Sequence, residues 1–98
     1  MSIAAVSMAP AGAGTSMSSY VAAAERVIRE DGRVKFRLDP MFTTIQGELP
    51  VIFEIILKMQ EAMYALGAQR VGTVIKIDDR RDKPLDMDAK IRAVEEKM

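Results

Sequence analysis

The sequence predicts an α+β fold in which the elements follow one another as strand, helix, strand, strand, helix, strand, with a helical tail after them. Two observations support this prediction. Residues 18–30 carry apolar side chains at three- and four-residue spacing, as an amphipathic helix does. Residues 50–65 have polar side chains only in a narrow stripe of the same spacing, as a mostly apolar helix does. The other stretches are rich in β-branched or alternating residues and are bounded by Gly, Pro or Asp, as short strands are.

The first strand and the first helix are expected at 3–9 and 18–30. Small residues at 10–14 allow the backbone to turn tightly between them. Ser16 or Ser18 can cap the helix, because a serine hydroxyl accepts a hydrogen bond from an unpaired N–H of the first turn. The apolar stripe consists of Val21, Ala24, Val27 and Ile28, while Glu25, Arg26, Arg29 and Glu30 lie largely off it.

A β-hairpin is expected next. Apolar and basic residues alternate through 34–38, a period of two that gives a strand with one wet or pairable face. Asp39 and Pro40 end this strand in a turn, and 41–48 is the second strand of the hairpin. Gly47 in that strand indicates a bulge or a close approach of backbone.

The second helix is expected from Pro50 to Ala65. Proline suits the first turn because its missing N–H would be unpaired there anyway, and Gly67 supplies a left-handed residue just past the end. The polar stripe of this helix is narrow: Glu54, Lys58 and Glu61, with Gln60 beside it. One sheet cannot cover the remaining apolar circumference, so part of this helix is expected in a contact between subunits.

The fourth strand is expected at 70–78, followed by a short charged helix from Asp86. This helix has a thin apolar seam through which it must dock, formed by Met87, Ile91, Val94 and Met98. This order of elements is the split β-α-β pattern of the ferredoxin-like fold, βαββαβ, with two helices on one face of a four-stranded antiparallel sheet. The second face of the fourth strand is mixed, so association through that face is also expected.

The composition narrows the classes of function. The 98 residues are expected to form one domain, 1–98. Because Cys and His are absent, a Cys/His zinc site and the usual nucleophile and base of acyl transfer are excluded, which makes an enzyme the weaker expectation. Fourteen basic and fourteen acidic residues balance, so no excess positive field is available to hold nucleic acid.

The protein is expected to be cytoplasmic and soluble, with no membrane partner. The small, apolar start of the chain, 1–19, has no Lys or Arg before its apolar part, unlike a signal peptide. The most apolar later stretch, 51–59, is interrupted by Glu54 and Lys58 and is too short to cross a bilayer core of about 30 Å.

Three stretches resemble the small thiamine-binding protein family: "VSMAPAGAGTSMSSYVAAAERVI", "LDPMFTTIQGE" and "GAQRVGTVIKIDDRRDKPLDMDAKIRAVEEK". The resemblance implies a ferredoxin-like domain, self-association into dimers or tetramers, and binding of thiamine or its hydroxymethylpyrimidine half, without catalysis or a cofactor. The family usually has Gly and Glu where this chain has Phe42 and Gln46.

Thiamine presents an aminopyrimidine edge with alternating donors and acceptors, and a positively charged thiazolium ring. Short hydroxyls and an amide suit the edge, and the candidates are Ser18, Thr43, Thr44 and Gln46. Glu48 or Asp39 can offset the cation, and Phe42 can offer it a ring face. The alternative is that the threonines are ordinary strand residues and Ser18 is only a cap.

The charged run "DDRRD", 78–82, follows the fourth strand. Its aspartates have no calcium-loop spacing and are interrupted by two arginines, which argues against a metal site. Arg80 and Arg81 could hold an anion through their forked guanidinium groups. Because the charges nearly cancel, the favoured expectation is that one arginine forks onto a carboxylate of its own loop or of a neighbouring subunit. A solvated charge run is the simpler alternative.

These observations together predict a non-enzymatic, oligomeric protein that binds thiamine or its pyrimidine moiety. The first alternative is a structural or regulatory oligomer with a vestigial pocket. The second is a ferredoxin-like enzyme that works through Asp and Arg.

Overall fold

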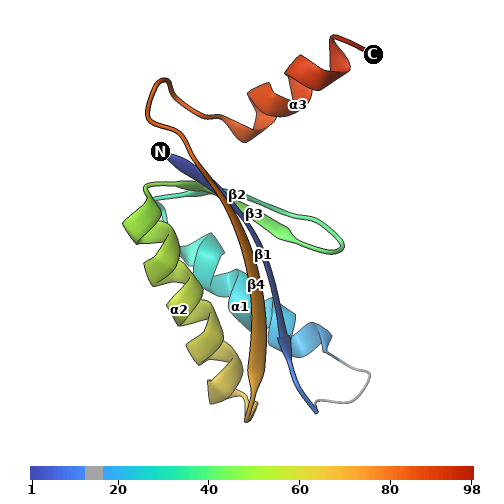
Figure 1. Ribbon diagram of the computed structural model, residues 1–98. Helices are drawn as coiled ribbons and strands as arrows, with labels where there is room; N and C mark the ends of the chain where they lie inside the picture. The colour runs from blue at the N-terminus through green and yellow to red at the C-terminus, as the bar shows by residue number, and fades with distance from the viewer. Residues whose placement is uncertain (13–16) are drawn as a thin grey trace.

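A computed structural model describes residues 1–12 and 17–98 and confirms the predicted α+β order (Figure 1). The elements are β1 (Ser2–Pro10), α1 (Ser18–Glu30), β2 (Lys35–Leu38), β3 (Thr43–Gly47), α2 (Leu49–Ala65), β4 (Val71–Asp79) and α3 (Met87–Glu95). The strands form one antiparallel sheet in the order β2-β3-β1-β4, which is the ferredoxin-like arrangement. The helices α1 and α2 lie side by side on one face, whereas α3 stands apart beyond the sheet (Figure 1).

Two local predictions about the ends of elements need correction. The N-cap residue of α1 is Met17, and Ser18 is the first residue of the helix, so Ser18 does not cap it. Ser16 and the end of the predicted 10–14 loop lie outside the described residues. The second hairpin strand begins at Thr43 rather than Met41, because the backbone N–H of Asp39 donates to the Phe42 carbonyl and closes the turn there.

The core lies between the sheet and the two helices. Every second residue of β1 and β3 points into it, as the period of two requires. Its buried members are Ala4, Val6, Ala24, Ile28, Ile45, Ile52, Ile55, Ile56, Met59 and Met63. Among the described residues no helix is long and apolar enough to cross a bilayer.

Gly47 allows the close approach that the sequence predicts. A Cβ placed on this residue would lie 2.8 Å from Cγ1 of Val34, a separation that real side chains avoid. The residue is buried at the end of β3, opposite Ser2 of β1. Glycine is therefore required at this position by packing.

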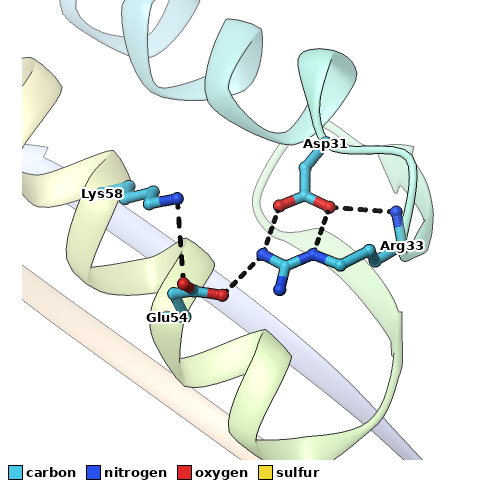
Figure 2. Close-up of polar contacts among 4 residues, drawn as sticks. All are labelled: Asp31, Arg33, Glu54 and Lys58. Carbon is cyan, nitrogen blue, oxygen red and sulfur yellow. Dashed lines mark hydrogen bonds and ion pairs between the residues drawn. The ribbon is translucent and has the colours of Figure 1, made fainter.

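An ion-pair cluster joins the end of α1 to α2 (Figure 2). Arg33 donates to both carboxylate oxygens of Asp31, at 3.0 Å from Nε and 2.7 Å from Nη2, and Nη2 also lies 2.5 Å from Oε2 of Glu54. Lys58 approaches the other oxygen of Glu54 at 3.9 Å. The side-chain and backbone hydrogen bonds from Arg33 lower the pKa of Asp31 to about 2.

The tail docks on the face of the sheet opposite α1 and α2. The backbone N–H of Met87 donates to Oε1 of Gln46 at 2.7 Å, and Nζ of Lys35 pairs with Asp86 at 3.0 Å. Lys90 pairs with Asp78 of β4 at 2.7 Å. Gln46, Lys35 and Asp78 belong to one cross-strand row, which also contains Ile3, so these contacts tie α3 to this row.

The apolar seam predicted for α3 is only partly buried. Leu85 and Met87 are buried where the helix begins. Ile91, Val94 and Met98 are exposed, so the prediction that all four seam residues dock is wrong for these three. The helix is therefore held by its first turn and by ion pairs, with the Asp86 side chain accepting from the N–H of Ala89 as a cap.

Candidate functional site

A cavity of about 270 Å³ lies where β1, α1, α2 and the β2–β3 turn meet. Its walls are mainly apolar and include Met8, Val21, Phe42 and Met59. Of the residues that the structure describes, Glu25 is the one ionisable side chain lining this cavity. A largely apolar cavity with few polar groups is the usual form of a small-molecule site.

Glu25 reaches the cavity from α1 and meets β3 there. Its Oε1 accepts a hydrogen bond from the Thr43 hydroxyl at 2.5 Å. Its Oε2 is buried and, within residues 1–12 and 17–98, has no hydrogen-bond partner. Because leaving a buried polar atom unpaired costs about 1 to 3 kcal/mol, this oxygen marks a place where a donor from a ligand would be stabilising.

Glu25 lies largely off the apolar stripe in the sequence, where little distinguishes it as a site residue. One signal was present, since Glu25 follows Val21 by four residues and therefore lies beside it on the helix surface. That spacing puts the carboxylate at the edge of the buried face. Its pairing with Thr43 depends on the packing of α1 against β3, which the sequence does not reveal.

A second, wider groove of about 600 Å³ adjoins the cavity along α1. Val21, Glu25 and Leu38 line both spaces, so the groove continues from the cavity. The groove is also lined by Ser18, Ala22, Arg26 and Arg29.

The structure divides the residues expected from the sequence between two faces of the sheet. Thr43 lines the cavity, together with Phe42, and Ser18 lines the groove beside it. Thr44 lies on the opposite face, in a row with Arg37 and Ala5. Side chains of successive strand residues point to opposite faces, so Thr43 and Thr44 cannot both line one cavity.

Gln46 also lies on that opposite face, where it holds the first turn of α3. Its Oε1 accepts the hydrogen bond from the Met87 N–H, and its Nε2 lies 3.9 Å from the sulfur of Met1. Asp39, the other candidate partner for a cation, accepts from Nε of Arg37 at 3.2 Å in the hairpin.

A third cavity of about 400 Å³ brings Glu48 and Arg81 together at the start of α2. Arg81 also donates from Nε to Asp79 at 3.3 Å. Hydrogen bonds from the Ser2 hydroxyl and from Arg81 lower the pKa of Asp79. This cavity lies at the opposite end of β1 from Glu25, because Ser2 pairs with Asp79 whereas Ser7 and Met8 line the first cavity.

Arg80 forms the forked contact within its own loop. Its Nε and Nη2 lie 2.6 and 2.9 Å from the two carboxylate oxygens of Asp82, and this bidentate pair lowers the pKa of Asp82 to about 2. Asp78 pairs instead with Lys90, and Asp79 with Ser2 and Arg81. The three carboxylates of 78–82 therefore contact different side chains.

A model of the family described as thiamine-binding protein matches residues 4–95. The chain belongs to the thiamine-binding protein family. Relatives of this chain include the UPF0045 protein YqgV of Bacillus subtilis, 42% identical over 98 residues that cover 96% of this chain and 94% of the relative.

Two solved structures share the fold of this thiamine-binding protein family member. One is a domain of unknown function, DUF77, from Bacillus cereus, with a TM-score of 0.83 and 30% identity, covering 92% of this chain and 86% of that one. The other is the protein MJ1052 from Methanocaldococcus jannaschii, with a TM-score of 0.78 and 34% identity, covering 97% and 96%.

Proposed function

We propose that this protein binds thiamine, or its hydroxymethylpyrimidine moiety, in the cavity beside Glu25 and Thr43. The observation that carries the proposal is Glu25, which lines a mainly apolar cavity and whose buried Oε2 has no donor among the described residues. Membership of the thiamine-binding protein family supports the choice of ligand. The proposal also includes the non-enzymatic role and the cytoplasmic location expected from the sequence.

The chemistry of the cavity suits an aminopyrimidine. A carboxylate only accepts hydrogen bonds, so Glu25 Oε2 requires a donor such as the exocyclic amino group of the pyrimidine. The Thr43 hydroxyl gives its proton to Oε1 and keeps lone pairs for a second donor. Phe42 and the methionines offer apolar surface to the ring.

The size of the cavity indicates how the ligand lies. A volume of about 270 Å³ is near the lower limit of about 300 Å³ for typical ligand pockets. It suits one ring better than the whole vitamin. The thiazolium ring would then extend along the adjoining groove, either past Val21 toward Ser18 or in the other direction toward Arg29.

Among the residues expected from the sequence, Ser18 and Thr43 remain in the proposed site and Glu25 joins them. Thr44, Gln46 and Glu48 lie elsewhere on the protein. We assign Gln46 the task of holding α3, because its amide oxygen already accepts the Met87 N–H.

The proposal includes assembly into a dimer or tetramer. The exposed apolar residues of α2, which are Phe53, Leu57 and Tyr64, support an intersubunit contact on that helix. The same exposed surface favours the second candidate function, a structural or regulatory oligomer with a vestigial pocket. The two candidates differ in whether the Glu25 cavity holds a ligand.

Calorimetric titration with thiamine and with hydroxymethylpyrimidine tests the proposal. Glu25→Gln and Thr43→Val should each weaken binding about tenfold or more, because each leaves a polar group of the complex unpaired. Gln46→Leu is the control, since it should loosen α3 and leave affinity unchanged. No heat and no thermal shift with either ligand would remove the proposal and favour the structural oligomer.

Mass spectrometry of gently purified protein provides an independent measurement. A retained molecule with the mass of thiamine or its pyrimidine half is the expected result. Its loss in Glu25→Gln, with retention in Gln46→Leu, would connect it to the cavity. Retention in all three proteins would place the ligand elsewhere.

A further inference from the structure

The groove beside the cavity carries two arginines that the thiamine proposal leaves unused. Arg26 and Arg29 both line it, three residues apart on the exposed side of α1. Within residues 1–12 and 17–98, neither guanidinium forms an ion pair with a carboxylate. Arg33, Arg37, Arg80 and Arg81 pair with an aspartate or glutamate, whereas Arg70 and Arg92, like Arg26 and Arg29, form no ion pair among the described residues but lie outside the groove.

The charges along the continuous space are unequal. Glu25 contributes one negative charge where cavity and groove meet, and Arg26 and Arg29 contribute two positive charges in the groove. A ligand that offered only donors and a cation would satisfy Glu25 and leave both guanidiniums facing a positively charged ring. A ligand that also carried an anion at its far end would complement both parts.

The spacing along α1 suits such a ligand. Arg29 follows Glu25 by four residues, so its side chain begins about one turn, or about 6 Å, farther along the same face of the helix. Two guanidiniums one turn apart can receive a phosphate through several charge-assisted hydrogen bonds. The groove is open, so the phosphate would keep part of its hydration.

We infer that the preferred ligand is a phosphate monoester of the same aminopyrimidine compound, with its ring beside Glu25 and its phosphate between Arg26 and Arg29. This inference rests on the proposed function, because it requires the ring to occupy the Glu25 cavity. The groove then selects the phosphorylated form of the ligand.

The test compares thiamine with thiamine monophosphate by calorimetric titration of the wild type and of the double variant Arg26→Gln with Arg29→Gln. The wild type should bind the monophosphate about tenfold more tightly, as expected for charge-assisted contacts at an exposed site. This preference should shrink as salt is raised from low to physiological concentration. The double variant should bind the two compounds with similar affinity, because the groups that distinguish them are gone.

Arg70→Gln with Arg92→Gln is the matched control, because these arginines lie outside the groove and their loss removes the same net charge. It should keep the tenfold preference. Equal binding of both compounds by the wild type, or a preference that survives in the Arg26 and Arg29 double variant, would overturn the inference and leave thiamine binding intact. Failure of the wild type to bind either compound would overturn the proposed function as well.

Discussion

The hydroxyl of Thr43 donates a hydrogen bond to Oε1 of Glu25 at 2.5 Å, and this contact connects the first residue of β3 to the middle of α1. Both residues line the cavity, and Thr43 is buried. The contact therefore has a structural role in the unliganded protein as well as a proposed role in binding.

Thr43→Val should lower the free energy of unfolding by about 1 to 3 kcal/mol, because it removes the donor of a largely buried carboxylate oxygen. Urea denaturation of the unliganded protein measures this change. Thr43→Ser keeps the hydroxyl and should lose less stability than Thr43→Val. A Thr43→Val protein as stable as the wild type would show that the hydrogen bond to Glu25 does not stabilise the fold.

Gly47→Ala should destabilise the protein by about 1 to 3 kcal/mol, as overpacking of a filled site does. The new methyl group would meet Cγ1 of Val34 at 2.8 Å. Val34→Ala removes that atom, so the same glycine substitution should cost less than about 1 kcal/mol in this background. Additive losses in the double variant, measured by urea denaturation, would contradict the packing argument.

The carboxyl group of Asp31 should titrate with a pKa of about 2 in the folded protein, below its ordinary value of 3.8. The folded-state pKa is lowered, so the stabilisation is present above pH 3.8 and is lost as the pH falls toward 2. Carboxyl NMR titration should show the pKa returning toward 3.8 in Arg33→Gln. Arg37→Gln should leave the pKa of Asp31 unchanged, because Arg37 pairs with Asp39.

Leu57→Asp should dissociate the proposed oligomer, because Leu57 is 63% exposed on α2. Ile52 of the same helix is fully buried within the subunit, so Ile52→Asp would report on folding instead. Val94→Asp is the matched control, since Val94 is 62% exposed on α3. Light scattering at micromolar concentration should show a smaller mass for Leu57→Asp than for the wild type or Val94→Asp. A monomeric wild type would contradict the α2 contact.

Gln46→Leu should speed amide exchange from Met87 to Glu95, because it removes the acceptor of the Met87 N–H. Arg80→Ala should have a smaller effect, since Arg80 pairs with Asp82 inside its own exposed loop. Hydrogen exchange followed by mass spectrometry distinguishes the two. Faster exchange in Arg80→Ala than in Gln46→Leu would show instead that the 78–82 loop holds α3 in place.

The sequence predicted the order of the elements because each carried a local signal. The helical spacing of 18–30 matched α1, and Pro50 and Gly67 bracketed α2, with Gly67 at a φ of 107°. The seam of α3 was overestimated, because periodicity identifies an apolar stripe without showing what covers it.

The residues of the candidate site were harder to predict from the sequence than the order of the elements. Thr43 and Phe42 could be selected from their residue types, and both line the cavity. Thr44 and Gln46 stood beside them in the sequence, but the alternation of the strand sends both to the other face. Glu25 looked like an ordinary polar residue of an amphipathic helix until α1 was packed against β3.

The pairing of β1 with β4 has a consequence for how the chain folds. β1 lies inside the sheet, yet both of its neighbours come later in the chain, and its contact with Asp79 through Ser2 spans 77 residues. Closing so long a loop slows folding relative to a protein with local contacts. During synthesis, a chain that has completed α2 still carries an unpaired edge on β1, open to association with other strands until 71–79 has left the ribosome.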